Sequence, residues 1–95
     1  MLAGGCHTME EGKTVILNNT GLHARPASLF VKKASEFNSD VKIIAGDKEV
    51  NAKSIMSVMS LGADKGTDVT IKAKGADEKQ AVKVLIKFIQ EDLLK

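Results

Sequence analysis

The chain has 95 residues, 43% hydrophobic and 27% charged, which suffices for one small core and leaves no room for a second domain. Fourteen lysines and arginines against twelve acidic residues give a formal net charge of +2, too small an excess to indicate a nucleic-acid-binding arm. A single cysteine excludes an internal disulfide, and no apolar run approaches the ~20 residues that cross a bilayer. We therefore expect one soluble domain, monomeric and without membrane insertion.

Residues 1–8 differ from the rest of the chain because they carry no charged side chain and include two adjacent glycines. The string before Cys6 resembles a lipoprotein cleavage box, but such a signal needs a charged segment and roughly 7–15 apolar residues before it. Cys6 and His7 are two metal-ligating residues without a spaced second pair, so we expect no metal site. We predict that residues 1–8 are an extension, of cloning origin or disordered, before a domain over residues 9–95.

The patterned part of the chain begins with a β-branched run, residues 13–17, that ends at a turn-forming Asn-Asn-Thr-Gly segment and is predicted to be a strand. A helix is predicted next, because apolar residues recur at three- and four-residue spacing and Pro26 suits a first helical turn. The apolar positions of this helix are Ala27, Phe30, Val31, Ala34 and Phe37.

Two strands, a short helix and a third strand are predicted in the middle of the chain. Residues 41–45 and 48–52 read as a hairpin around a Gly-Asp turn. Residues 54–61 read as a helix that starts at a serine and is stopped by Gly62. Residues 67–74 alternate between apolar and polar side chains, which is typical of a strand with one buried face.

The last segment is predicted to be an amphipathic helix. Asp77 and Gln80 stand at the spacing of a capping box. The apolar positions that follow are Val82, Leu85, Ile86, Ile89 and Leu93, and a solvated polar stripe holds Lys79, Lys83 and Lys87. The element order β-α-β-β-α-β-α, with one apolar face per element, predicts an α+β fold in which helices cover one face of a single sheet.

One histidine stands where a glycine turn meets the start of a helix, in the hexapeptide Gly-Leu-His-Ala-Arg-Pro, residues 21–26. Free backbone N–H groups and the positive end of the helix dipole favour phosphate at such a terminus and disfavour a protonated ring. Arg25 adds a fork of donors suited to phosphate oxygens. His23 is therefore a candidate phosphoryl-accepting nucleophile, although on spacing alone it equally fits a helix-capping residue beside a solvated arginine.

This hexapeptide, followed by alanine, resembles the active-site signature of HPr, the histidine-containing phosphocarrier of the bacterial sugar phosphotransferase system. The resemblance runs from about Met9 to the end of the chain. It implies an open-faced β-sandwich, a four-stranded antiparallel sheet covered on one face by three helices, in a cytoplasmic protein that is neither an enzyme nor dependent on a cofactor. It also implies that His23 accepts a phosphoryl group on Nδ1 from enzyme I and passes it to the IIA domains of sugar permeases. Arg25 and the backbone of Ala24 would assist that transfer.

The same resemblance gives a second role to the helix that begins at residue 54. Ser54 alone reads as a helix cap, but it resembles the regulatory serine of Gram-positive-type HPr, which an ATP-dependent HPr kinase/phosphorylase modifies. Ile55, Met56 and Met59 are either core residues or an exposed docking patch beside His23. The resemblance implies that this patch and Arg25 contact enzyme I and the IIA domains. It also implies that a catabolite control repressor binds here once the serine is phosphorylated. We predict that both methionines are partly exposed, whereas two other apolar residues, Val58 and Leu61, are buried.

Two other classes of function compete with a phosphoryl relay. One is a regulatory binding protein of the same family that has lost the relay, against which the presence of His23 counts. The other is a small RNA- or ligand-binding module, but the sequence has neither a GxxG clamp nor an aromatic sheet face. We therefore expect protein partners and no nucleic acid.

Overall fold

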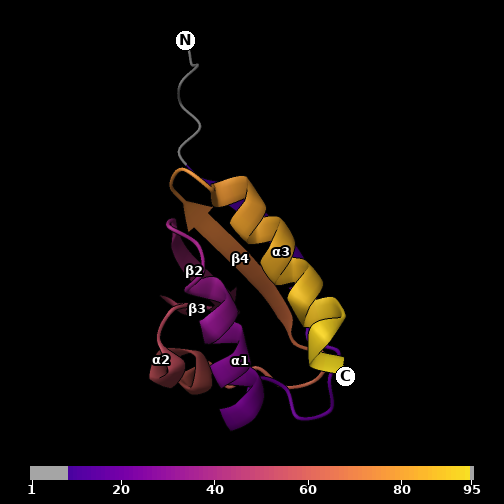
Figure 1. Cartoon of the computed structure of the whole chain (residues 1–95). Coiled ribbons are helices and arrows are strands. Elements are labelled where there is room, and N and C mark those ends of the chain that lie inside the picture. The colour runs from indigo at the N-terminus through magenta and orange to yellow at the C-terminus, as the bar shows by residue number, and fades with distance from the viewer. Residues whose placement is uncertain (1–8, 95) are drawn as a thin grey trace.

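The computed structural model describes residues 9–94 as one antiparallel sheet with helices on one of its faces (Figure 1). The strands are β1 (Glu10–Val15), β2 (Asp40–Ala45), β3 (Lys48–Asn51) and β4 (Asp68–Lys74). The helices are α1 (Ala24–Ala34), α2 (Ile55–Ser60) and α3 (Glu78–Gln90), followed by a 3-10 turn over Asp92–Leu94. The strands lie in the order β1-β4-β2-β3, all antiparallel, so the predicted open-faced α+β sandwich is confirmed.

The core lies between the sheet and the helices, and the alternation of the strands decides which residues enter it. In β4 the three predicted inward residues, Val69, Ile71 and Ala73, are all buried, whereas the residues between them, Thr70 and Lys72, are not. Phe30 of α1 and Phe88 of α3 meet above the sheet with their ring centroids 6.4 Å apart. Gly12 lies directly under α3, where a Cβ would overlap the Ile86 side chain. The absence of a side chain at that position allows α3 to pack directly on β1.

Several element boundaries differ from those predicted. β1 starts at Glu10 and ends at Val15, because its ladder follows the length of β4 from Ala73 back to Asp68. Helix α1 ends at Ala34, and Phe37 packs half-buried against the core from the turn that follows. Helix α3 ends at Gln90, yet Leu93 is still buried because the 3-10 turn carries it back toward the core. Apolar periodicity therefore identified most of the buried positions in these helices, but it missed Ala81 and Phe88 and overran the helix ends.

The predicted capping box at the start of α3 is wrong. Asp77 occupies the N-cap position but makes no side-chain cap. Its carboxylate instead accepts hydrogen bonds from the hydroxyl and the N–H of Ser39 and from the N–H of Asn38, just before β2. These bonds, the Ser39 hydroxyl foremost, hold the pKa of Asp77 below its ordinary value of 3.8. Asp77 therefore joins two chain segments at the end of the sheet where β2 begins, rather than capping its own helix.

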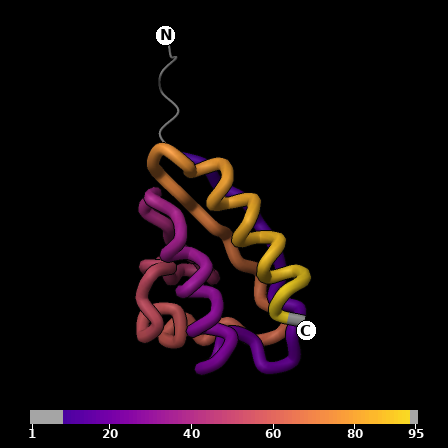
Figure 2. The backbone as a smooth tube through the Cα atoms, in the orientation of Figure 1, coloured from indigo at the N-terminus to yellow at the C-terminus, as the bar shows by residue number. Residues whose placement is uncertain are grey.

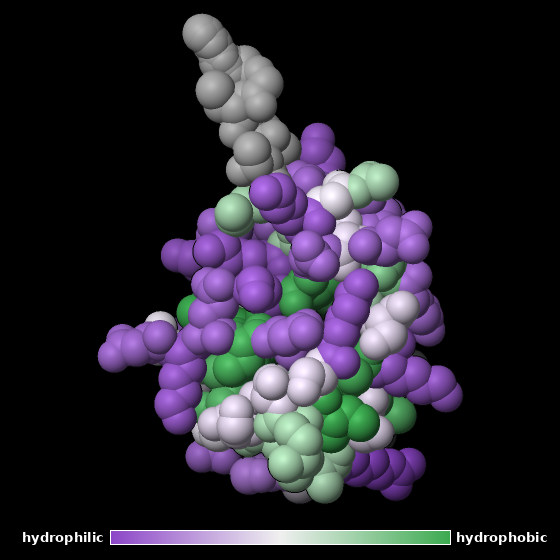
Figure 3. All heavy atoms as spheres, turned by 90° about the vertical axis from the view of Figure 1, so that its left-hand side faces the viewer, coloured by the Kyte–Doolittle hydropathy of each residue, from purple (hydrophilic) through white to green (hydrophobic). Residues whose placement is uncertain are grey.

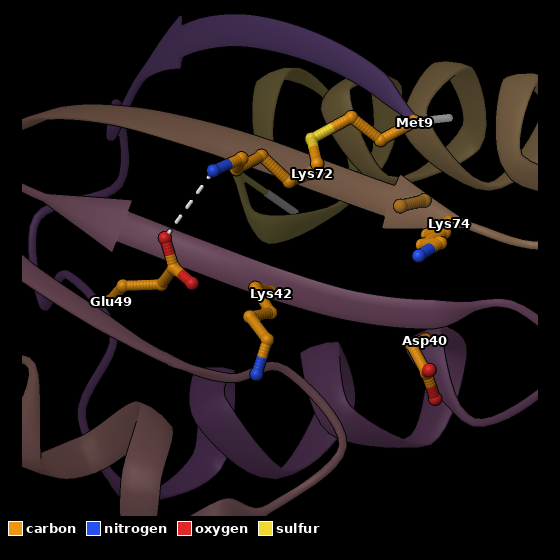
Figure 4. Close-up of a pocket in the computed structure, with 7 residues that line it drawn as sticks. Met9, Asp40, Lys42, Glu49, Lys72 and Lys74 are labelled. Carbon is orange, nitrogen blue, oxygen red and sulfur yellow. Dashed lines mark hydrogen bonds and ion pairs between the residues drawn. The ribbon is translucent and has the colours of Figure 1, made fainter. Parts of the chain in front are cut away.

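The open face of the sheet is a surface of mixed charge. Lys72 extends toward Glu49 of β3, and its Nζ lies 3.4 Å from a carboxylate oxygen (Figure 4). Lys42, Lys74 and Asp40 lie close by around a shallow pocket of about 150 Å³. Because cations and anions are neighbours here, the face offers no continuous positive surface for a phosphate backbone. The expected absence of nucleic-acid binding stays a prediction.

Candidate functional site

His23 occupies the N-cap position of α1, in extended backbone conformation, and 64% of its side chain is exposed. The ring makes no capping hydrogen bond. The backbone carbonyl of His23 instead accepts the N–H of Ala27, which begins the helix. The imidazole therefore does not cap the helix, and most of it is open to solvent.

The segment before His23 is fixed against the loop that leads into β4. Leu22 is buried, and its N–H donates to the carbonyl of Ala63 over 2.8 Å. Gly21 has a φ of 62°, and a Cβ there would overlap the Ala63 carbonyl and lie 2.8 Å from Asp64 Cα. Figure 2 shows the loop before α1 and the loop between α2 and β4 together at the lower end of the molecule. A glycine is thus required where the two loops touch.

This contact brings an unpredicted residue to His23. Oδ1 of Asp64 lies 3.2 Å from Nε2 of His23, across 41 residues of sequence. Both side chains are largely exposed, at 64% and 73%. A carboxylate at one ring nitrogen favours the tautomer with hydrogen on that nitrogen, which leaves the lone pair on Nδ1. Nothing in the local pattern around Asp64 signals this role, since the residue stands in an unremarkable Gly-Ala-Asp-Lys-Gly loop.

The first turn of α1 supplies donors for an anion beside the ring. The N–H groups of Ala24 and Arg25 have no carbonyl four residues back within the helix, Pro26 has no N–H, and the N–H of Ala27 is already used by His23. Arg25 is exposed and has no hydrogen-bond or ionic partner within residues 9–94. Two backbone donors and a free guanidinium therefore accompany the histidine, and each can bind phosphate oxygens.

A surface hollow of about 480 Å³ lies between the histidine and the 3-10 turn that follows α3. It is lined by Pro26 and Leu29 of α1 and by Leu93 of the 3-10 turn, as well as by His23 and Arg25. Leu29 is 44% exposed, and the sequence analysis did not identify it as a surface residue. A reactive ring beside a partly apolar hollow suits contact with a folded partner.

Helix α2 presents a second surface. Ile55, Met56 and Met59, called here the α2 patch, are 42%, 78% and 40% exposed. Val58 is fully buried and Leu61 nearly so, so the predicted division of this helix is confirmed. In Figure 3, green and pale-green spheres gather in the lower part of the molecule, where α2 lies, whereas the upper part is mostly purple.

Ser54 caps α2, as its position predicts. Its Oγ accepts the N–H of Ser57 over 3.3 Å, and the residue is partly exposed. The structure places Ser54 and His23 at the starts of two helices that pack against each other. The hydroxyl of Ser54 bonds to its own helix, and the ring of His23 to Asp64. The phosphorylation of Ser54 stays a prediction, as do the roles of Ala24, Arg25 and the α2 patch.

Residues 9–94 carry neither a metal cluster nor a membrane-spanning helix. Within them, no three or more potential ligands gather as a metal site would need, and no helix is long and apolar enough to cross a membrane. The extension predicted at residues 1–8, with Cys6 and His7, lies outside the described part of the chain.

Comparison with known proteins identifies the class of protein that this fold and site define. The family described as "PTS HPr component phosphorylation site" matches residues 10–91, so the chain belongs to the HPr family of the phosphotransferase system. Members of this family are phosphocarriers and not enzymes. The HPr-like protein Crh of Bacillus subtilis (strain 168) is 47% identical over 85 residues, which are 90% of this chain and 100% of Crh.

Two solved structures extend the comparison. The phosphocarrier protein HPr from Bacillus anthracis (strain Ames) is 39% identical with a TM-score of 0.85, over 88% of this chain and all of that one. An HPr dimer from Thermoanaerobacter tengcongensis is 49% identical with a TM-score of 0.71, over 84% of this chain and 92% of that one. The second structure conflicts with our expectation of a monomer, because a close relative of the same fold forms a dimer.

Proposed function

We propose that this protein relays phosphoryl groups through His23 in the cytoplasm, accepting them from enzyme I and passing them to sugar-specific IIA domains. The observation that carries the proposal is the placement of an exposed imidazole at the start of α1, with Asp64 at Nε2 and Arg25 close along the chain. Membership of the HPr family supports a phosphocarrier role in general. Enzyme I and the IIA domains are proposed as partners because the resemblance to HPr implies them.

The chemistry of the site fits a carrier better than an enzyme. A carrier needs a nucleophile, donors for the oxygens of the transferred group and open access for two successive partners. His23 supplies the nucleophile, and the N–H groups of Ala24 and Arg25, together with the guanidinium, supply the donors. The ring lies at the surface rather than in a closed cavity, so water and partners reach it equally.

The α2 patch supports brief docking of enzyme I and the IIA domains beside the histidine. Methionine side chains adapt to differently shaped partners, which suits a protein that must bind several in turn. Ile55, Met56 and Met59 are together exposed on a short helix that packs against α1. A small apolar patch of this kind suits a transient interface.

Ser54 supports a regulatory role through an HPr kinase/phosphorylase. A phosphate there adds about −1.5 to −2 charges at the start of α2, where the helix dipole tolerates an anion. The new charge adjoins Ile55 and Met56, so we expect it to alter docking at the α2 patch and to leave the fold intact. In the phosphorylated state a catabolite control repressor is the proposed partner.

The test is incubation of the protein with phosphoenolpyruvate and enzyme I, followed by mass spectrometry of the intact chain and of its peptides. We expect one acid-labile phosphoryl group on His23. His23→Ala should fold and take up none, whereas Ser54→Ala should be labelled as the wild type is. Label on another residue, or none with a competent enzyme I, would contradict the relay.

A purely regulatory HPr-like protein is the second candidate, favoured by the 47% identity to Crh. This candidate predicts that an HPr kinase modifies Ser54 while enzyme I leaves His23 unmodified. Both incubations on the same preparation therefore separate the two functions.

A further inference from the structure

The backbone of Asp64 is fixed by hydrogen bonds at both its N–H and its carbonyl group. Its N–H donates to Oγ1 of Thr67 over 3.1 Å, and its carbonyl accepts the N–H of Thr67 over 3.0 Å. The preceding residue, Ala63, accepts the N–H of Leu22 next to the histidine. Lys65, the adjacent cation in the chain, donates to Oδ1 of Asn19. The carboxylate thus starts from a fixed turn and reaches Nε2 of His23.

We infer that Asp64 is a positioning residue for His23, an inference that rests on the proposed relay. Oδ1 of Asp64 accepts the hydrogen on Nε2 and keeps it there, so that Nδ1 carries the lone pair that reacts. The carboxylate also compensates the positive charge that the ring acquires on reaction. A carboxylate hydrogen-bonded to the other nitrogen of a reacting histidine acts in this way in hydrolytic triads.

The electron count of the transfer shows where the charge arises. The Nδ1 lone pair forms the new N–P bond. The bond between phosphorus and the nitrogen of a phosphoramidate donor breaks, and the donor nitrogen keeps its electrons. The hydrogen on Nε2 stays in place, so the phosphorylated ring is an imidazolium. Its positive charge is shared with Nε2, 3.2 Å from Oδ1 of Asp64. An opposite charge at this distance stabilises the product and the transition state leading to it.

The experiment uses a small donor, potassium phosphoramidate, so that docking to a partner does not enter the rate. The wild type, Asp64→Asn and Asp64→Ala are labelled side by side, with Asp40→Asn as the control. Asp40 is an exposed carboxylate at the start of β2, in register with Lys74 at the end of β4 far from Asp64, and its loss changes the net charge equally. The rate of labelling and the nitrogen that carries phosphorus are read by phosphorus and nitrogen NMR, and the same ring signals report the tautomer before reaction.

Asp64→Asn keeps an oxygen that accepts the Nε2 hydrogen but removes the charge. We therefore expect label still on Nδ1, at a rate lowered about two- to fivefold, the range that an exposed ion pair supports. Asp64→Ala removes both, so we expect a similar loss of rate together with label on both ring nitrogens. Asp40→Asn should match the wild type in rate and position. A merely structural role for Asp64 would leave the labelled nitrogen unchanged.

The outcomes separate the inference from the proposed relay. If enzyme I labels His23 and Asp64→Ala behaves as the wild type toward phosphoramidate, the relay stands and the inference about Asp64 is overturned. If enzyme I does not label His23 but the nitrogen labelled by phosphoramidate depends on Asp64, the inference stands and the relay fails. If neither donor labels His23 in the wild type, both are overturned.

Discussion

Gly21 is the position where a single methyl group should disturb the fold and the site together. Its φ of 62° places it in the left-handed region, and a Cβ there would overlap the carbonyl oxygen of Ala63. Gly62 has a similar φ of 67° but open space around its Cα, so Gly62→Ala is a matched control. Both substitutions carry the left-handed cost of about 1–2 kcal/mol, and only Gly21→Ala adds a backbone clash.

The clash can be relieved only if the two loops separate. Separation breaks the hydrogen bond between Leu22 and Ala63 and partly exposes Leu22, which we assess together at about 2 kcal/mol. Gly21→Ala should therefore lower the free energy of unfolding by about 2 kcal/mol more than Gly62→Ala, roughly 8–16 °C in Tm for a domain of this size. Urea unfolding followed by circular dichroism measures both. Equal losses in the two variants would refute the close approach of the loops.

Three further predictions concern stability. Asp77→Asn should lose stability at neutral pH, because the lowered pKa of Asp77 stabilises the fold above about pH 4. The difference from the wild type should shrink as acid protonates the wild-type carboxyl. Ser39→Ala, which removes the main hydrogen-bond donor to Asp77, should weaken the same pH dependence in urea titrations. Val58→Ala should lower the free energy of unfolding by about 2 kcal/mol, and Met56→Ala by less than about 0.5 kcal/mol. Only Met56→Ala should slow phosphoryl transfer from enzyme I while the protein stays folded. Equal losses of stability would contradict the burial of Val58 and the exposure of Met56. Ser54→Ala should cost about 1 kcal/mol through its lost cap and Ser54→Asp should not, as thermal unfolding would show; matching losses would rule out the cap.

Much of the fold was predictable because its signals are local. The alternation in β4 fixes its buried face, and the three- and four-residue spacing in α1 and α3 fixes theirs. The division of α2 into a buried Val58 and an exposed Met56 also followed from how few side chains a short helix can bury. His23 was singled out because a turn and a helix start lie next to it in the chain, but only the resemblance of its hexapeptide to the HPr signature favoured a phosphoryl-accepting role over a helix cap.

The contacts missed by sequence reasoning all join distant segments. Asp64 meets His23 across 41 residues, and Asp77 meets Ser39 across 38. In both cases the local sequence suggests another role for the carboxylate. Asp64 reads as a solvated loop residue and Asp77 as a helix cap. Only the strand order decides between these local roles and the observed contacts. It carries the loop before β4 next to the loop before α1, and the pairing of β2 with β4 brings Ser39 next to Asp77.

The place of β1 at the sheet edge has a consequence for how the protein is made. β1 leaves the ribosome first, but its pairing partner, β4, starts at Asp68, and α3, which covers it, ends at Gln90. Until β4 has been synthesised, β1 has no ladder and the loop carrying His23 has no Ala63 to hold it in place. A nascent chain therefore displays His23 without this setting until the residues up to the end of β4 have left the ribosome.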